Sequence, residues 1–324
     1  MTVLIVTFSH DNESIPLVIK ALETMGKKAF RLDTDRFPTE VKIDLYSDDQ
    51  KAGIITDGEQ QLELSEVSSV WYRRMRQGQK LPNDMDSQFR EASLKECRLS
   101  LRGMIASLPG FHLDPITNVD RTNHKQLQLQ VARQLGLLIP GTLTSNNPEA
   151  VKQFAQEFKA TGIVTKMLSQ FAIYDENKQE MVVFTSPVTD EDLDNLEGLQ
   201  FCPMTFQENI PKALELRITI VGKQLFTAAI NSQQLEGATY DWRKEGRALH
   251  QQWQAYDLPQ IIEKQLLELM TYFGLNYGAI DMIVTPDERY IFLEINPVGE
   301  FFWLELYPPH FPISQAIAEI LVNS

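Results

Sequence analysis

The sequence predicts an α/β fold with an N-terminal open α/β domain, a small central lid-like domain and a C-terminal antiparallel-sheet α+β domain. Strand-like apolar runs alternate with amphipathic helices over residues 1–115. Two strands around a polar turn mark residues 116–199, and antiparallel hairpins dominate residues 200–324. A chain of 324 residues is also longer than one ordinary core supports, so these three domains are expected.

Hydrophobic periodicity gives the elements of the first domain. Residues 3–9 are expected to form a strand, and SIPLVIKALETMG an amphipathic helix that ends at Gly26. Further strands are expected at 28–37 and 68–76, a long helix at 86–108, and a junction to the next domain at 114–120.

The other two domains are read in the same way. A helix is expected over 122–136, with Thr or Asn as its cap and Gly136 at its end. Another helix begins after Asn147, because Pro148 suits the first helical position. The remaining elements are strands at 163–174 and 180–187, an acidic helix at 189–198, a hairpin at 216–230 turning at Gly222-Lys223, a helix at 258–274, and strands at 277–285 and 289–296.

Composition and charge exclude several classes of protein. The formal net charge is −14, whereas a nucleic-acid-binding protein needs a basic surface, so a cationic partner or metal ions are expected instead. No apolar run approaches the roughly 18 residues of a membrane span, and the opening MTVLIVTF lacks the features of a signal peptide. Cys97 and Cys202 lie far apart without a CxxC motif, which predicts a cytoplasmic protein with reduced cysteines.

Polar residues interrupt the two last strands. Asp281 lies in YGAIDMIVT, and Glu294 and Asn296 end RYIFLEIN. A hairpin symmetric about residues 287–288 would bring these side chains to one face of the sheet. The expected pairs are Ile283 with Phe292, Asp281 with Glu294, and Ala279 with Asn296.

Such a pair of carboxylates needs a counter-charge. At about 4 Å they would repel by roughly 4 kcal/mol at an effective dielectric near 20, and a divalent cation reverses the sign. Oxygen ligands from Asp281, Glu294 and Asn296, with positions left open for phosphates, suit Mg²⁺. A half-exposed strand end, or a carboxyl pair that shares a proton, is the alternative.

Candidate nucleotide-binding residues lie outside any Walker A or dinucleotide motif. Lys166 lies in the apolar strand IVTKML, where a buried ammonium needs an anion. Lys125 opens a helix, whose free N–H groups favour anions. For each lysine the alternative is a surface side chain that extends its amine to water.

A strand that runs into a polar turn has the pattern of an adenine-binding hinge. The strand ends at Phe206, and the turn begins with Gln207, Glu208 and Asn209. Glu215 follows at a spacing that suits the ribose hydroxyls. Arg217 lies two residues further along the next strand, so it shares the face of Glu215 and is expected to reach phosphate oxygens.

The order of these motifs resembles the ATP-grasp superfamily over residues 115–324, so an ATP-grasp fold is expected. The segments RLDTDRFP, VWYRRMR, TYDWRKEG and EINPVGEFFWLE are similar to the ATP-grasp ligases that macrocyclise microviridin-type peptides (graspetides). The opening MTVLIVTFSHDNESIPLVIKAL resembles the ester-forming (macrolactone) member of that family. This resemblance covers essentially the whole chain.

The resemblance implies a carboxylate ligase that uses ATP and Mg²⁺ and produces ADP and phosphate. Asp or Glu side chains of a ribosomally made precursor peptide with a leader would be activated as acyl phosphates, and Thr or Ser hydroxyls would close ω-ester rings. The implied ligands are Lys125 and Lys166 for the phosphates, Gln207, Glu208, Asn209 and Ile210 for adenine, Glu215 for ribose, and Asp281, Glu294 and Asn296 for Mg²⁺.

Arginines are the candidate groups for catalysis and substrate steering. Arg217 and Arg243 would stabilise the transferring phosphoryl group and the tetrahedral intermediate, because guanidinium is always charged and binds oxygens in pairs. The alternative for Arg243 is an ion pair with a neighbouring carboxylate. Arg73 and Arg74 would steer the carboxylates of the peptide, unless they are only a solvated strand end.

The acidic segment TDEDLDNLEG is a candidate leader-binding site. Glu191, Asp192 and Asn195 would receive a leader arginine, while the hairpin 171–185 would take aromatic side chains. The alternative is that these acids only complement a helix dipole. A homodimer is compatible with the superfamily, whereas nucleic acid and membranes are not expected as partners.

Other functions remain open at this stage. An amide-forming (lactam) graspetide ligase would look alike, as would a ligase that adds amino acids to a protein or small-molecule carboxylate. A peptide-binding scaffold with an inactive ATP site is the non-enzymatic alternative.

Overall fold

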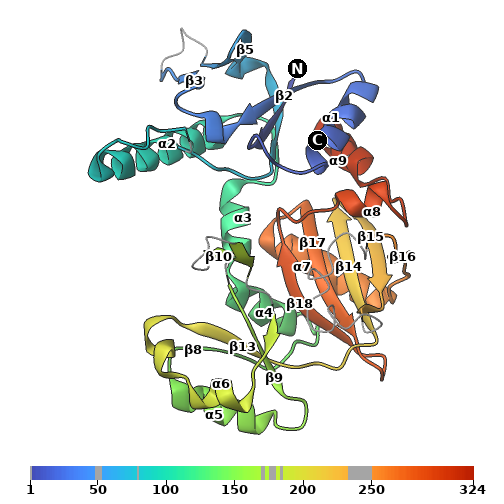
Figure 1. Cartoon of the computed structure of the whole chain (residues 1–324). Helices are drawn as coiled ribbons and strands as arrows, with labels where there is room; N and C mark the ends of the chain where they lie inside the picture. The colour runs from blue at the N-terminus through green and yellow to red at the C-terminus, as the bar shows by residue number, and fades with distance from the viewer. Residues whose placement is uncertain are drawn as a thin grey trace.

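The computed structural model of the chain describes residues 2–47, 53–78, 80–168, 172–174, 180–182, 185–232 and 250–324. Figure 1 shows an N-terminal unit, a central unit reached through α3 and α4, and a sheet that carries the last third of the chain. The C-terminal helix returns to lie beside α1 of the N-terminal unit.

The N-terminal unit contains a four-stranded parallel sheet in the order β2-β1-β6-β7. Every residue of β1 is buried, as expected for a parallel strand that is covered on both faces. The elements are β1 (Thr2–Thr7), α1 (Ser14–Thr24), β2 (Lys28–Asp33), β6 (Val67–Tyr72), α2 (Ser87–Ser107) and β7 (Phe111–Leu113). A separate antiparallel sheet of β3 (Val41–Asp44), β4 (Ile54–Asp57) and β5 (Gln60–Glu63) was not expected.

The central unit is a small antiparallel sheet in the order β12-β9-β13-β8, packed against α5. The Asn147 side chain caps α5 by accepting from the N–H of Glu149, as predicted. The elements are β8 (Thr142–Ser145), α5 (Pro148–Glu157), β9 (Ile163–Lys166), β12 (Ser186–Pro187), α6 (Asp190–Asp194) and β13 (Met204–Glu208), with β10 (Ala172–Tyr174) and β11 (Glu180–Val182) forming a separate two-stranded ladder.

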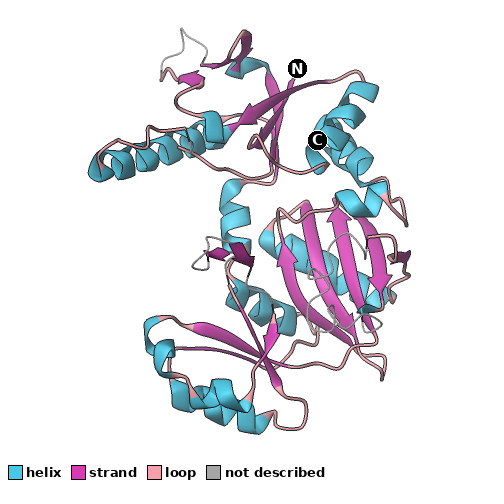
Figure 2. Cartoon of the chain, in the orientation of Figure 1, coloured by secondary structure: helices cyan, strands magenta, loops and turns pink. Residues whose placement is uncertain are grey.

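The large antiparallel sheet has the order β16-β15-β14-β17-β18 (Figure 2). Helices α4 and α7 cover one face, where apolar residues of all three elements form one core. The predicted hairpin turn at Gly222-Lys223 is confirmed, with Val221 paired to Gln224 and Gly222 in the left-handed region at φ 60°. The elements are α4 (Lys125–Gln134), β14 (Leu214–Val221), β15 (Gln224–Ile230), β16 (Gln254–Ala255), α7 (Gln260–Phe273), β17 (Tyr277–Val284) and β18 (Tyr290–Asn296).

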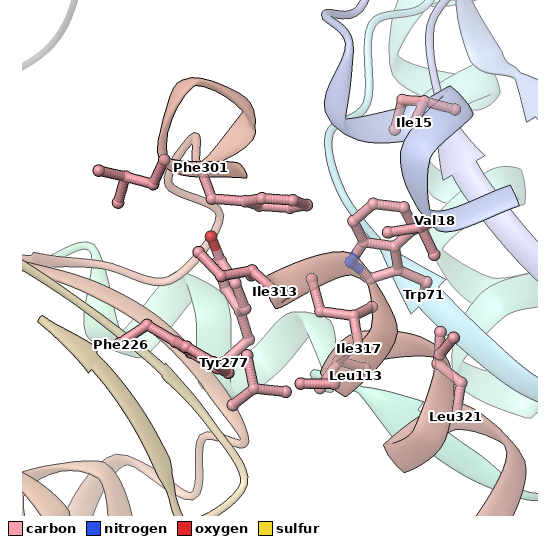
Figure 3. Close-up of a cluster of buried hydrophobic side chains, with 14 of the residues drawn as sticks. Ile15, Val18, Trp71, Leu113, Phe226, Tyr277, Phe301, Ile313, Ile317 and Leu321 are labelled. Atoms are coloured by element: carbon pink, nitrogen blue, oxygen red, sulfur yellow. The ribbon is translucent and has the colours of Figure 1, made fainter. Parts of the chain in front are cut away.

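The last two helices, α8 (Phe302–Leu306) and α9 (Ile313–Asn323), join the large sheet to the N-terminal unit. In Figure 3, Ile317 and Leu321 of α9 pack with Trp71 and Leu113 of the parallel sheet. The same buried cluster includes Tyr277 of the large sheet. Sequence periodicity had not indicated these helices, and the domain limits at 115 and 199 stay a prediction.

The junction between units differs from the expectation. Residues 116–122 form helix α3 (Ile116–Thr122), and α4 begins after His124, whose side chain makes no cap hydrogen bond. The predicted Thr or Asn cap is therefore wrong, because Thr122 donates to Asn118 O inside α3. Asp114 fixes this junction by accepting from the main-chain N–H groups of Asn276 and Tyr277 at 2.8 and 2.9 Å. Burial raises the pKa of Asp114 to about 6, despite these hydrogen bonds.

Candidate active site

The two predicted carboxylates face each other across β17 and β18. Asp281 pairs with Glu294 and Ala279 with Asn296, as predicted. Ile283, however, pairs with Ile291 instead of Phe292, because the hairpin is centred on Asp287 instead of between residues 287 and 288, with Thr285 N–H donating to Arg289 O. A β-bulge beyond Asp281 adds one residue to β18 and restores the expected pairing at the site.

Four side chains converge at this end of the hairpin. The Asn296 amide donates to Asp281 Oδ2 at 3.3 Å and to Glu294 Oε1 at 3.1 Å. Lys125 of α4 contacts Glu294 Oε2 at 2.9 Å and donates to Asn296 Oδ1 at 3.2 Å. One lysine and one amide therefore hold the two carboxylates together.

Glu294 is an anion kept charged by its neighbours. Burial would raise the pKa of Glu294, but the ammonium groups of Lys125 and Lys166 and the hydrogen bonds from Lys125 and Asn296 hold it well below its usual range. Lys166 ends β9 of the central unit, so this effect brings a residue of that unit into the electrostatic environment of the large sheet. The alternative of a carboxyl pair that shares a proton does not fit this environment.

Arg217 anchors the other side of the cluster. Its Nη1 donates to both carboxylate oxygens of Asp281, at 2.9 and 3.1 Å, and its Nη2 donates to Glu300 O at 2.9 Å. Its guanidinium lies 5.4 Å from the centre of the Trp303 ring. Burial would lower the pKa of Arg217, but Asp281 raises it above its usual value, so the side chain stays charged.

The predicted hinge begins later than expected, because β13 continues through Gln207 and Glu208, so only Asn209 and Ile210 of the predicted residues lie in the connection to β14. The main-chain N–H groups of Glu208 and Asn209 donate to Gly141 O and Gly162 O inside the central unit. Within the described residues, the N–H of Ile210 donates to no main-chain carbonyl. The buried Gln207 side chain donates to Thr142 Oγ1 at 2.9 Å.

Glu215 lies on the same face of β14 as Arg217, as predicted. Its carboxylate pairs with Lys212 at 2.9 Å and accepts from the Ser232 hydroxyl. Sequence analysis had missed Lys212 and Ser232. The motif ENIPKALELR contains Lys212 three residues before Glu215, a spacing that suits an ion pair.

The two predicted steering arginines lie where the parallel sheet meets the loop after Asn296. Arg73 is 2% exposed and donates to the carbonyls of Val298 and Gly299. Its Nε and Nη2 have no hydrogen-bond partner among the described residues. Burial lowers the pKa of Arg73 to about 10. Arg74 is 32% exposed and pairs with the Glu300 carboxylate at 3.0 Å.

Sequence analysis missed Asp11, which lies beside both arginines, 3.8 Å from Arg73 Nε and 3.7 Å from Arg74 Nη1. The loops that follow β1 and β6 carry these residues. In the order β2-β1-β6-β7, the chain leaves β1 toward one edge of the sheet and β6 toward the other, so the crossovers diverge between these two strands. Open α/β sheets bind ligands in such crevices at the carboxyl ends of their strands.

The remaining predicted residues lie apart from this cluster. Asp192 forms a capping box with Thr189 at the start of α6, and these hydrogen bonds lower its pKa. Asn195 donates to the carbonyl of Glu191. Arg243 and the segment TYDWRKEG lie outside the described residues, as does most of the turn within 171–185.

The donor set of the sheet suits a hard cation. The carboxylates of Asp281 and Glu294 both lie within hydrogen-bond distance of the Asn296 amide nitrogen. Oxygen donors of this kind are those that Mg²⁺ prefers. The described part of the chain has no group of three or more His, Cys, Asp and Glu side chains able to hold a metal ion, so the amide has to complete the set.

Comparison with known proteins identifies the family. Residues 2–120 match a family model described as the MvdD pre-ATP grasp domain. The crystal structure of the macrocyclase MdnC from Microcystis aeruginosa MRC, bound with the precursor peptide MdnA, is 83% identical to this chain; the match covers 100% of both chains with a TM-score of 0.92. The chain belongs to the microviridin-type (graspetide) ATP-grasp macrocyclases.

Two further ATP-grasp ligases of known structure are similar to this chain over nearly their whole length. The RiPP-associated ATP-grasp ligase of Chryseobacterium gregarium, in complex with ADP and a leader and core peptide, is 38% identical over 99% of this chain and 96% of its own, with a TM-score of 0.93. MdnB from Microcystis aeruginosa MRC is 37% identical over 100% and 99%, with a TM-score of 0.84. The predicted ATP-grasp fold is therefore confirmed.

Two other findings are negative. Comparison with curated protein sequences finds no match. Among the helices of the described residues, none combines the length and the apolar character of a membrane span.

Proposed function

We propose that this ATP-grasp ligase closes ω-ester (lactone) rings in a ribosomally made precursor peptide. An Asp or Glu side chain of the peptide attacks the γ-phosphate of ATP, ADP leaves, and an acyl phosphate forms. The hydroxyl of a Thr or Ser in the same peptide then attacks the acyl carbon, gives up its proton and displaces phosphate. Each ring removes one water from the peptide, and one ATP becomes ADP and phosphate.

One observation carries this proposal: cations and oxygen donors converge on one end of the large sheet. Contacts of 2.9–3.3 Å connect Lys125, Glu294, Asn296, Asp281 and Arg217. They do so in a chain that is 83% identical to a macrocyclase bound with its precursor peptide. Fixed charges of this kind suit phosphoryl transfer, in which the protein mainly positions the reactants and balances charge.

The nucleotide lies between the central unit and the large sheet in this proposal. Lys125 and Lys166 bind the phosphates, the main chain from Gln207 to Ile210 contacts adenine, and Glu215 accepts from the ribose. The N–H of Ile210, which donates to no main-chain carbonyl of the described residues, supports a role in binding the adenine edge. Mg²⁺ held by Asp281, Glu294 and Asn296 supplies charge that balances the phosphate oxygens.

The arginines act on the reacting groups. Arg217 donates directly to the proposed metal ligand Asp281 and, with Arg243, stabilises the transferring phosphoryl group and the tetrahedral intermediate. Arg73 and Arg74 bind carboxylates of the peptide at the crevice of the parallel sheet. The Nε and Nη2 atoms of Arg73, which have no hydrogen-bond partner among the described residues, support this role, as does the partial exposure of Arg74.

The preference for esters rests on the opening segment of the sequence, which resembles the ester-forming member of the family. Amide formation is the alternative.

Mass spectrometry tests the proposed reaction. A microviridin-type precursor with its leader is incubated with the protein, ATP and Mg²⁺, and a sample without ATP serves as the control. We expect the loss of one water per ring, with the rings reopened by mild base. Rings that resist mild base would show that the enzyme forms amides instead of esters. An unchanged peptide would contradict macrocyclisation of this precursor.

We further propose that the leader contacts α6, through Glu191, Asp192 and Asn195. The capping box already occupies Asp192, so Glu191 is the cleaner position to change. Glu191→Lys is expected to raise the Kd of the leader peptide by about 10-fold or more, because a charge-assisted hydrogen bond contributes about 1.5–3 kcal/mol. Fluorescence anisotropy with a labelled leader measures this, with Glu149→Lys at the first turn of α5 as the control. Equal affinities of both variants and wild type would remove α6 from the leader site.

A further inference from the structure

Strand β18, which carries two of the proposed metal ligands, lies at the edge of the large sheet. In an antiparallel strand, the main-chain groups of successive residues point to opposite edges. The groups of Ile295, between Glu294 and Asn296, point away from β17 and need partners elsewhere, because buried main-chain groups are nearly always paired.

A single side chain supplies these partners. Gln128 of α4 has no exposed surface, and its Oε1 accepts from Ile295 N–H at 3.0 Å. Its Nε2 donates to Ile295 O at 2.8 Å and also bonds to Thr122 O. The amide thus pairs with Ile295 on both sides, as a residue of a neighbouring strand would.

The same helix delivers the lysine of the site. Lys125 and Gln128 are three residues apart on α4, so they share one face of the helix. Lys125 approaches Ile295 O at 3.3 Å while it contacts Glu294 and Asn296. One helix face therefore fixes both the backbone between the two ligands and the cation that faces them.

The position of Ile295 determines the position of both ligands. Its side chain is completely buried in the core, which places the flanking side chains of Glu294 and Asn296 on the opposite face of the sheet. A shift or rotation of this residue would move both ligands together.

We propose that Gln128 is a positioning residue for the metal site: its amide, paired with both main-chain groups of Ile295, sets the alignment of Glu294 and Asn296 for Mg²⁺ and of Lys125 for the phosphates. This inference rests on the proposed metal site. Gln128 touches neither metal nor nucleotide and acts through the backbone between the two ligands. Partners that orient metal ligands typically contribute about 10- to 100-fold to metal affinity.

Two variants of Gln128 and one control test the proposal. Gln128→Leu removes both bonds to Ile295, and Gln128→Glu keeps the shape and an acceptor but removes the donor. Gln265→Leu is the control, because Gln265 of α7 also donates to a main-chain carbonyl, that of Leu135, just beyond the opposite end of α4. The readout is the Mg²⁺ concentration that half-saturates binding of a fluorescent ADP analogue, with melting temperature and leader affinity measured in parallel.

We expect Gln128→Leu to raise the half-saturating Mg²⁺ concentration by about 10-fold or more, and Gln128→Glu to raise it in the same direction. Leader affinity should stay at the wild-type value, which also reports that the chain is folded. Gln265→Leu should lower the melting temperature without changing the Mg²⁺ dependence.

Two results would overturn the proposal in different ways. If either Gln128 variant is folded and keeps the wild-type Mg²⁺ dependence, Gln128 only stabilises the fold. If the wild-type protein binds the ADP analogue equally with and without Mg²⁺, the metal site itself is wrong. The Gln128→Glu variant, the milder change, decides the first point if Gln128→Leu does not fold.

Discussion

Glu294→Gln is expected to abolish ring formation, lowering turnover by about 10²- to 10³-fold or more. The carboxylate faces the ammonium groups of Lys125 and Lys166, and an isosteric amide removes the negative charge that both of them face. Removing one partner of a buried ion pair costs about 3–5 kcal/mol. Each 1.36 kcal/mol of lost transition-state stabilisation lowers the rate tenfold. Mass spectrometry of the precursor and ADP release measure the loss.

The same variant has a signature in the pH dependence of stability. The pKa of Glu294 is depressed in the folded chain, so its contribution to the free energy of unfolding is present above the unfolded pKa near 4.5. That contribution is lost as the pH falls through the folded pKa. The melting temperature of Glu294→Gln should therefore depend less on pH than that of the wild-type protein below about pH 4.5.

Glu288→Gln in the adjacent turn is the control, because Glu288 is exposed. Its backbone has a positive φ of 62°, and glutamine places a side chain of the same size there. It should match wild type in ring formation. Wild-type ring formation by Glu294→Gln would remove Glu294 from the metal site. An unchanged pH dependence of its melting temperature would contradict the pairing with the two lysines.

Local pattern was enough to predict the strands that carry the site. Polar residues at Asp281, Glu294 and Asn296 interrupt apolar strands, and a period of two places their side chains on one face. The pairing of Asp281 with Glu294 was nevertheless right for an incomplete reason. The displaced centre of the turn and the bulge shift the register in opposite directions and cancel at the site, and neither leaves a signal in the periodicity.

The residues that sequence analysis missed act over long separations in the chain. Gln128 lies 167 positions from Ile295, and glutamine within a polar helix such as KQLQLQ gives no sign that it is buried. Asp11 likewise meets Arg73 and Arg74 only through strand order in the parallel sheet. Helix α9 was not predicted, and its apolar face packs on the other end of the chain, against α1 and β6, as well as on β14.

The order of the family motifs along the chain supplied part of the information that local patterns lacked. The apolar strand around Lys166 indicated only that its ammonium needs an anion, and the order of the motifs linked it to ATP. The structure places it near enough to Glu294 to lower the pKa of that carboxyl. Arg243 had the same kind of support, but it lies outside the described residues and stays a prediction.

Arg217→Lys is expected to lower turnover by about 10²-fold or more while the chain remains folded. Arg217 makes three hydrogen bonds in two directions, to both oxygens of Asp281 and to the carbonyl of Glu300. A lysine ammonium is a single point charge, and it cannot bond to the Asp281 carboxylate and the Glu300 carbonyl in the way that the planar guanidinium does. The substitution keeps the positive charge beside Asp281. A large loss of activity would therefore be caused by the lost hydrogen-bond geometry of the guanidinium and not by a lost charge.

Hydroxylamine separates the two steps in which Arg217 is expected to act, because it traps an acyl phosphate as a hydroxamate. If Arg217 stabilises the transferring phosphoryl group, Arg217→Lys should lose hydroxamate and rings in equal measure. Hydroxamate that persists without rings would restrict Arg217 to the tetrahedral intermediate. Arg121→Lys, changed at an arginine that stacks on Tyr272, should behave as wild type. Wild-type rates of both products in Arg217→Lys would contradict either role, and would leave the bond to Glu300 O as a purely structural contact between the sheet and its loop.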